Sequence, residues 1–336
     1  MKLLMYGNRS VQEYKEMAER IFEEMKTSTE DKTTYSTDLS VLPWNFYETG
    51  KLVLYQTINT HQDFEISILI DDIYESMPNN PVLYFKTLFN FRGEGSLFNF
   101  LRNKGYMKGI KSHAKKIYKG VSFFKIRGHI TEEGIKNLNR VINYIYSYIQ
   151  KLKLIAVDKN MYDYIKKSYD LAFNSGSKKI KHVLGFMKQY IRVAWKYKYN
   201  YLIAQHKLLP LYDKDVITKF CDRLTLNNSV IVVGNSSFDK TLVEKYPEFV
   251  ENFPETIKDD HEIFNLESDF YNAKYAEFKL KSDFITTVEN LELNTLAEEV
   301  LQNFPSFTQM NHLPKDQISL KNSCENLDLK QVRIIY

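Results

Sequence analysis

Histidines are the residues in this chain most able to do metal chemistry, because neutral imidazole is a common ligand of Zn²⁺. The chain has seven, and no two lie within five residues of each other: His61, His113, His129, His182, His206, His261 and His312. The nearest approach to a zinc motif is His129-Ile130-Thr131-Glu132-Glu133, with Glu133 where the inverted motif His-x-x-Glu-His has its second histidine. Thr131 followed by two glutamates is instead typical of a helix start, where carboxylates favour the positive end of the dipole. We predict no metal site and no catalytic residue.

Two glycine-bearing turns could place free amides around a phosphate. Gly93-Glu94-Gly95-Ser96 precedes a predicted helix, but it lacks the lysine of a P-loop and follows no strand. Val230–Gly234 reads as a strand entering a turn with one glycine, which is too few for the dinucleotide fingerprint. No Gly-x-Ser-x-Gly nucleophile elbow occurs in the sequence. We therefore predict no nucleotide cofactor.

Basic residues gather in two clusters, and tyrosines are interleaved with the first. The clusters are Lys104, Lys108, Lys111, Lys115, Lys116 and Lys119, and then Lys178, Lys179, Lys181, Lys188, Arg192, Lys196 and Lys198. Such a pattern can bind a nucleic-acid backbone while aromatic rings stack on bases. The net charge of +4 is small beside 46 basic and 42 acidic residues, which favours solvated surfaces instead. A nucleic-acid partner is therefore the less favoured alternative.

Composition describes an ordinary globular chain of 336 residues, with 43% hydrophobic and 26% charged residues. Cys221 and Cys324 are too far apart in sequence to suggest a disulfide framework or a metal-ligand spacing. No apolar run approaches the ~18 residues of a membrane span, and the apolar start Met1–Met5 is too short for a signal peptide. We expect a soluble protein without a membrane partner, in a compartment that the sequence does not reveal.

The elements that must position these residues fall into three stretches. Leu3–Tyr6 predicts a short strand, and Ser10 with Glu13 predicts a capped helix through residue 26, followed by a polar linker over residues 27–40. The middle stretch predicts strands at 52–56 and 64–70, helices at 81–90 and 96–102, a hairpin at 106–118 and 121–127, and one helix from Thr131 to Leu152. That last helix carries the apolar stripe Ile135, Leu138, Ile142, Ile145, Ile149 and Leu152.

Beyond residue 152 the periodicity is weaker. We predict helices at 159–172, 177–193, 198–204 and 213–223, and a buried strand at 229–233. From Glu244 onward charge and proline rise, so we expect extended chain with short helices near residues 295–302.

The order of these motifs resembles the second domain of the insulinase-like zinc metallopeptidases, also called the pitrilysin family. Three segments carry the resemblance: Met1–Lys26, Pro81–Leu152, and Asn228–Phe238 followed by Leu313-Pro314-Lys315. The resemblance implies an α+β sandwich, with an antiparallel sheet of about six strands and helices on one face. It divides the chain into residues 1–36, the end of the preceding catalytic-type domain and a linker, residues 37–325, the second domain, and a tail at 326–336.

By the same resemblance the parent protein hydrolyses peptides with zinc-activated water. Because this chain lacks His-x-x-Glu-His, we expect it to bind no zinc and to be inactive alone. It would wall the peptide-binding chamber and support the zinc domain. Its partners would be a peptide substrate and the remaining domains of the parent. An alternative is a stand-alone inactive subunit, like the non-catalytic partner in mitochondrial processing peptidase.

The resemblance also implies a substrate-binding strand at Lys111, Ser112, His113 and Ala114, which would lie in the chamber and pair with the amino-terminal end of the peptide. An exposed strand edge offers its amides and carbonyls to an extended peptide whatever the peptide's sequence. Ser112 and His113 replace glycines that the family has there. A plain edge strand without a ligand is the alternative interpretation.

Overall fold

The computed structural model describes residues 3–25, 49–58, 60–73, 79–118, 120–175, 183–194, 208–254, 263–269, 271–292, 294–302 and 304–305. The chain forms two compact units. The larger unit contains Trp44–Ser168 and Leu209–Lys315, and the smaller contains Met1–Pro43, Tyr169–Leu208 and Asp316–Tyr336. The predicted peptide-binding strand lies in the larger unit.

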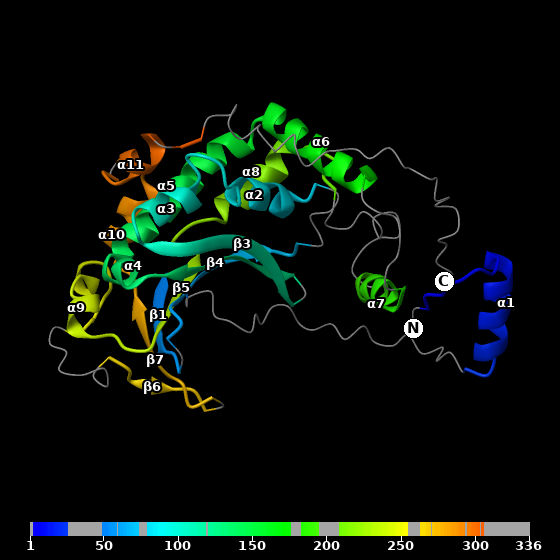
Figure 1. The fold of residues 1–336 in the computed structure, drawn as a ribbon, viewed down its shortest axis with the longest axis horizontal. Coiled ribbons are helices and arrows are strands. Elements are labelled where there is room, and N and C mark those ends of the chain that lie inside the picture. Colours follow the sequence, from blue (N-terminus) through cyan, green and yellow to red (C-terminus); the bar gives the residue numbers. More distant parts are fainter. Residues whose placement is uncertain are drawn as a thin grey trace. The chain divides into compact units, whose positions relative to one another are not determined.

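The larger unit is built on one sheet, which has seven strands in the described part of the chain (Figure 1). Their order is β3-β4-β2-β5-β1-β7-β6, so β3 lies at one end. The strands are β1 (Lys51–Gln56), β2 (Asp63–Asp71), β3 (Met107–Tyr118), β4 (Val121–Ile130), β5 (Ser229–Asn235), β6 (Leu266–Glu267) and β7 (Lys274–Lys279).

The predicted fold class is confirmed, with one difference in the sheet. Neighbouring strands are antiparallel except β1 and β5, which run parallel. Strand β5, which follows the long helical stretch in the sequence, lies between β1 and β2 and is the parallel partner of β1. Strands β1 and β2 are therefore consecutive in the sequence but are not neighbours in the sheet. A hairpin could not make that parallel pair, whereas a long crossover can.

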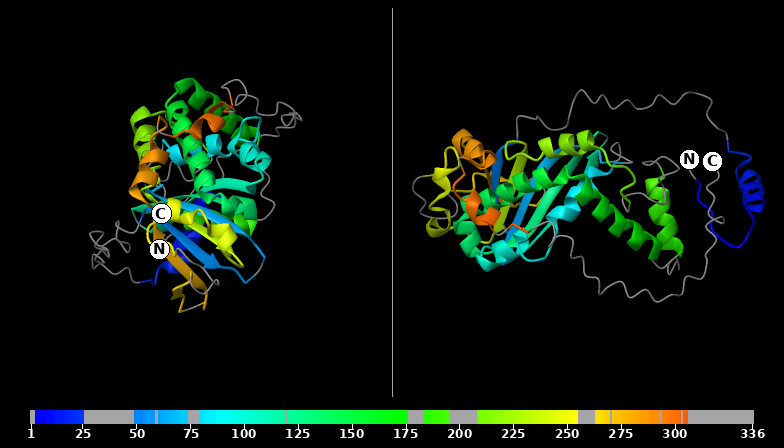
Figure 2. Two further views of the ribbon diagram at one scale, coloured as in Figure 1. Left: turned by 90° about the vertical axis from the view of Figure 1, so that its left-hand side faces the viewer. Right: turned by 90° about the horizontal axis from the view of Figure 1, so that it is seen from above.

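Helices cover one face of this sheet, as both views of Figure 2 show. They are α2 (Pro81–Phe89), α3 (Leu97–Asn103), α4 (Glu132–Lys136), α5 (Leu138–Ala156), α8 (Lys214–Asp222), the short 3₁₀ turn η4 (Tyr246–Glu248), α10 (Ser282–Glu289) and α11 (Ala297–Gln302). Helix α9 (Lys240–Val243) lies beside α4 at one end of the sheet (Figure 1). Alternate strand residues point at the covering helices and form the core, at most 1% exposed: Leu52, Leu54, Phe64, Ile66, Ile68, Phe124, Ile126, Ile231 and Val233. We call the other face of the sheet the open face, because no described helix of the larger unit covers it.

The predicted apolar stripe is confirmed, because all six of its residues, Ile135 in α4 and the other five in α5, are fully buried. The predicted single helix is nevertheless divided into α4 and α5. Asn137 interrupts it at φ −112° and ψ 38°, and its side-chain amide donates to the main-chain oxygen of Glu133 at 3.0 Å. An asparagine that bonds its own backbone in this way competes with the helical conformation.

The region after Glu244 is more structured than predicted. Strand β7 pairs with β1, and α10 and α11 pack on α5. Only Ala276 of β7 is fully buried, so the strand carries almost no alternating apolar signal. Its place in the sheet comes from pairing with a strand more than two hundred residues earlier, which a local pattern cannot reveal.

The smaller unit contains α1 (Val11–Phe22) and α7 (Val183–Val193), and α6 (Lys159–Ser175) runs into it. Helix α1 has the predicted capping box between Ser10 and Glu13, but the predicted strand at Leu3–Tyr6 is wrong, because those residues adopt no regular structure. The predicted linker, the helix at 198–204 and the tail at 326–336 lie outside the described residues. None of the helices in the described ranges is long and apolar enough to cross a membrane.

Candidate functional site

The predicted binding residues lie on β3, which in the described chain is hydrogen-bonded within the sheet to β4 alone. Lys111 pairs with Arg127, Ser112 with Ile126, His113 with Lys125 and Ala114 with Phe124. In an antiparallel ladder the main-chain groups of successive residues point alternately toward and away from the neighbouring strand. Ile110, Ser112 and Ala114 are the residues whose main-chain groups point away from β4.

The outward main-chain groups of Ser112 are already bonded. The Ser112 N–H donates to Oδ1 of Asn90 at 2.7 Å, and the Asn90 Nδ2 donates to the Ser112 carbonyl at 3.0 Å. Asn90 is the residue that ends α2, and its own N–H donates to the Lys86 carbonyl. One side-chain amide therefore makes the two bonds that a residue of a neighbouring strand would make.

Arg92 bonds the next outward residue in the amino-terminal direction. Its Nη2 donates to the Ile110 carbonyl, and its guanidinium lies 4.1 Å from the centre of the Phe98 ring. In the other direction, the outward main-chain groups of Ala114 have no hydrogen-bond partner among the described residues. The edge is therefore free at Ala114.

The side chains of the four predicted residues divide between the two faces of the sheet. Ser112 is buried on the helical side, and Ala114 is half-buried. Lys111 and His113 lie on the open face, where they help to line a hollow of about 780 Å³. Its other lining residues come mainly from neighbouring strands: Tyr55, Asp63, Phe64, Glu65, Arg92, Phe98, Gly109, Ile110, Arg127, Gly128, His129 and Val232.

Charged side chains of both signs line the hollow or lie next to it. Glu65 pairs with both Lys125 and Arg127. Burial raises the pKa of Glu65, but hydrogen bonds from Lys125, Ser67 and Arg127 together outweigh it and hold that pKa below its ordinary value. Burial lowers the pKa of His113, and the nearby charge of Arg127 lowers it further. At neutral pH His113 is therefore an uncharged imidazole beside exposed Lys111.

Gly234 of β5 lets an aromatic side chain cross the open face. The Tyr55 ring lies over Gly234, and its hydroxyl donates to Oδ2 of Asp63, two strands away, at 3.0 Å. A Cβ added at Gly234 would lie 2.4 Å from Cζ of Tyr55. Burial, followed by the bond to Asp63, raises the pKa of Tyr55 to about 12. This side chain is therefore a fixed neutral wall of the hollow.

The donor set for a metal ion is not assembled in the described part of the chain, where no group of three His, Cys, Asp or Glu side chains could hold one. His129 lies 3.8 Å from Asp63 on the open face, and the hydroxyl of Thr131 accepts the N–H of Gly134 as the predicted helix cap. Burial raises the pKa of the Cys221 thiol to about 12, which makes it a poor nucleophile. The residues described here do not fit zinc.

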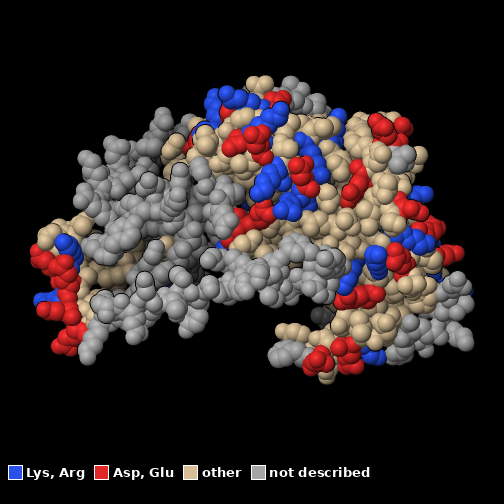
Figure 3. Space-filling view, turned by 180° about the vertical axis from the view of Figure 1, so that it is seen from behind, with Lys and Arg blue, Asp and Glu red and all other residues tan. Residues whose placement is uncertain are grey.

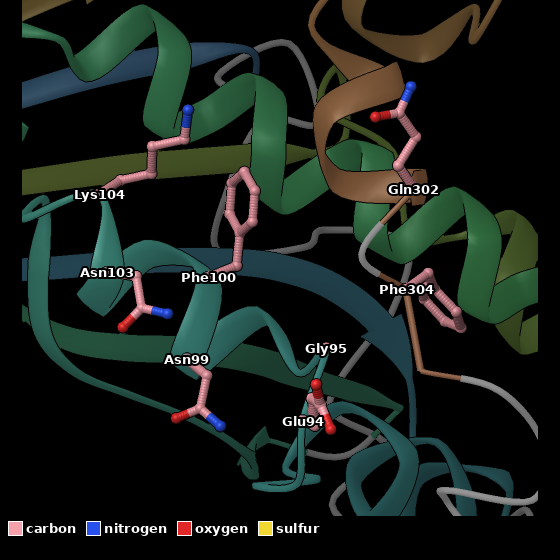
Figure 4. Close-up of a pocket in the computed structure, with 8 residues that line it drawn as sticks. All are labelled: Glu94, Gly95, Asn99, Phe100, Asn103, Lys104, Gln302 and Phe304. Carbon is pink, nitrogen blue, oxygen red and sulfur yellow. The ribbon is translucent and has the colours of Figure 1, made fainter.

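A second hollow of about 710 Å³ lies beside the Gly93–Ser96 turn (Figure 4). Its walls come from α3 and the turn on one side, and from the end of α11 and Phe304 on the other. Asn99 donates to the Gly93 carbonyl, and Ser96 caps α3. The turn joins two helices, as predicted, and these polar groups form hydrogen bonds within the turn and the helix that follows it.

The basic clusters are partly neutralised. Lys104 pairs with Glu299 at 2.6 Å, and Lys116 pairs with Asp72. Most of the second cluster lies outside the described residues. On the face that Figure 3 shows, Lys and Arg are interspersed with Asp and Glu, so no single-sign surface forms there. This mixed surface does not favour a polyanion.

Known proteins resemble this chain in sequence and in fold. Residues 1–169 match the family described as Peptidase M16 inactive domain. Insulin-degrading enzyme of Bos taurus is 23% identical over 256 residues, which are 74% of this chain and 24% of that protein. The A-factor-processing enzyme of Saccharomyces cerevisiae is 24% identical over 202 residues, which are 58% of this chain and 19% of that protein.

Fold similarity extends over more of the chain. The crystal structure of pitrilysin superposes on 90% of this chain and 28% of its own, with a TM-score of 0.69 and 16% identity. That identity supports a shared fold alone. The chain thus spans about a quarter of the length of the first of these sequence relatives.

Proposed function

Because the chain belongs to the M16 peptidase family through the match of residues 1–169 to its inactive domain, we propose that it walls the peptide chamber of a larger zinc metallopeptidase and holds extended peptides there. The zinc-activated water of such an enzyme would belong to the remaining domains of the parent protein. This chain alone would cleave no peptide.

The observation that carries the proposal is the free sheet edge at Ala114. An extended peptide can add to such an edge by main-chain hydrogen bonds, which impose no sequence requirement. Sheet edges elsewhere in the described fold are less suitable, since β6, at the opposite end, is only two residues long. Strand β3 is twelve residues long, and Ala114 lies well inside it.

The hollow beside β3 supports the same proposal. A peptide strand added to the edge would direct alternate side chains over the open face, next to Lys111 and His113. The hollow there is about 780 Å³, large enough for more than one side chain. Its mixed charges would accept polar residues of either sign, which suits an enzyme of broad specificity.

The test replaces Ala114 by proline. The Ala114→Pro variant loses the outward N–H, but edge strands tolerate proline where the N–H faces solvent, so the fold should survive. We expect binding of fluorescein-labelled random peptides of about ten residues, the length of a long strand, to fall at least about tenfold in a fluorescence anisotropy titration.

The matched control is Ala114→Val, which adds a side chain of similar size to proline's but keeps the N–H. It should bind the labelled peptides as the wild type does. If the proline variant binds as well as the valine variant, the peptide does not pair with this edge and the proposal is wrong.

A further inference from the structure

The side chain of Asn90 occupies the position that a bound peptide would take at Ser112. Its two hydrogen bonds, 2.7 Å and 3.0 Å long, satisfy both outward groups of that residue. We propose that Asn90 is a built-in competitor that sets the affinity of the β3 edge for peptides, and that a peptide must displace it. This inference rests on the proposed function.

The position of Asn90 is fixed by the helix before it. Phe85, Leu88 and Phe89 of α2 are buried, and the Phe89 ring packs against the rings of Phe124 and Tyr148. The Asn90 N–H is bonded to the Lys86 carbonyl at 3.0 Å. In the free protein the backbone of Asn90 is therefore held in place, and its amide stays bonded to Ser112.

Departure of that side chain must be accompanied by a shift of the chain at the end of α2. Neighbouring strands lie about 4.8 Å apart, and the half-buried Asn90 side chain fills that space. The freed groups of Ser112 would then pair with the peptide. Two hydrogen bonds within the protein are exchanged for two hydrogen bonds to the peptide. Pairing at Ser112 therefore adds to the binding free energy only the difference between the two sets of bonds.

Ala114 supplies the place where a peptide can begin to pair. Its outward groups have no partner among the described residues, whereas those of Ser112 are bonded and the Ile110 carbonyl is bonded by Arg92. Pairing would therefore start at Ala114 and extend toward Ser112 as Asn90 leaves. Arg92 would limit its further extension.

The experiment compares Asn90→Ala with wild type in two measurements. Alanine fits the Asn90 backbone, which has φ −84° and ψ 9°. In the free protein, amide hydrogen exchange should be slow at Ser112 and fast at Ala114 in wild type, and fast at both in the variant. Binding of the labelled random peptides should be about tenfold tighter in the variant, because the peptide no longer has to displace the two hydrogen bonds of Asn90.

The matched control is Asn103→Ala, which removes the same amide from the end of α3, where it lines the other hollow. It should change neither the exchange of Ser112 nor peptide affinity. The exchange rate of the Ser112 amide in the wild type is measured without any variant. It therefore tests the inference even if the Asn90→Ala protein folds poorly.

The outcomes separate the two proposals. Equal peptide affinity of wild type and Asn90→Ala, with Ala114→Pro still impaired, overturns the role of Asn90 and leaves the peptide-binding edge intact. Exchange at Ser112 as fast as at Ala114 in the free wild type also overturns it. Absence of peptide binding by wild type and Asn90→Ala alike refutes the proposed function, and the competitor role with it.

Discussion

At the scale of single residues, Gly234 controls the open face of the sheet. Its missing side chain leaves room for the Tyr55 ring, which reaches across it to Asp63. In a Gly234→Ala variant the ring must move and the hydrogen bond is lost. We expect the free energy of unfolding to fall by about 1–3 kcal/mol, the usual cost of overpacking, in a urea titration.

Gly109 provides the control for that substitution. It also lies in a strand of the sheet, but a Cβ added there would meet nothing within 4 Å. Gly109→Ala should leave the urea midpoint nearly unchanged. If the two substitutions changed the free energy of unfolding equally, the position of the Tyr55 ring would not depend on the missing side chain of Gly234.

Residue-level prediction worked where the cause was local. Thr131 caps its helix as predicted, and Gly105 follows the end of α3 in the left-handed conformation at φ 74°, which glycine adopts readily. Asn90 escaped prediction because its partner, Ser112, lies 22 residues away. An asparagine after a helix is an ordinary helix end, and nothing local marks it as a partner of a strand.

At the scale of elements, α5 joins the helical layer to the sheet through a buried tyrosine. Tyr146 is fully buried, and its hydroxyl donates to Oγ of Ser229 in β5 at 3.0 Å. Burial raises the pKa of Tyr146, as it does for Tyr246 in η4. In the unfolded chain, tyrosine loses its proton near pH 10, whereas the folded protein holds it to higher pH.

The sign of the resulting pH dependence follows from that difference. The stabilisation is complete below about pH 10 and decreases above it, because the unfolded state then binds fewer protons than the folded state. We expect stability to fall by about 1.4 kcal/mol per pH unit for each fully buried tyrosine. Urea titrations between pH 9 and about pH 11 would measure the slope.

In Tyr146→Phe, the decrease of stability with pH should be smaller by the contribution of one buried tyrosine, about 1.4 kcal/mol per pH unit. Tyr271→Phe is the control, because Tyr271 is 77% exposed in the folded protein. A slope unchanged in Tyr146→Phe would contradict the assignment of the alkaline loss to buried phenols.

Elements with a strong period were predictable, and elements held by distant pairing were not. The apolar stripe that runs through α4 and α5 was visible in the sequence, and all of its residues are buried. Strand β7 was missed, since a short strand with one buried alanine resembles a loop until β1 lies beside it. The break at Asn137 was missed because the stripe continues through it.

At the scale of the whole molecule, the order of motifs along the chain correctly predicts the family and the fold class. What the sequence could not reveal is the state of the β3 edge. The edge is partly closed by two side chains of the α2–α3 connection and open at Ala114. Tertiary packing decides that state, because it brings the end of α2 against the strand.

The central claim is that this chain holds peptides on the β3 edge without cutting them. Mass spectrometry tests both halves in one measurement, by following hydrogen exchange in the chain and the mass of an added random peptide. We expect amide hydrogen exchange at Ala114 to slow by at least about tenfold when peptide is bound, and the peptide to stay intact. A cleaved peptide, or bound peptide with unchanged exchange at Ala114, would contradict the claim.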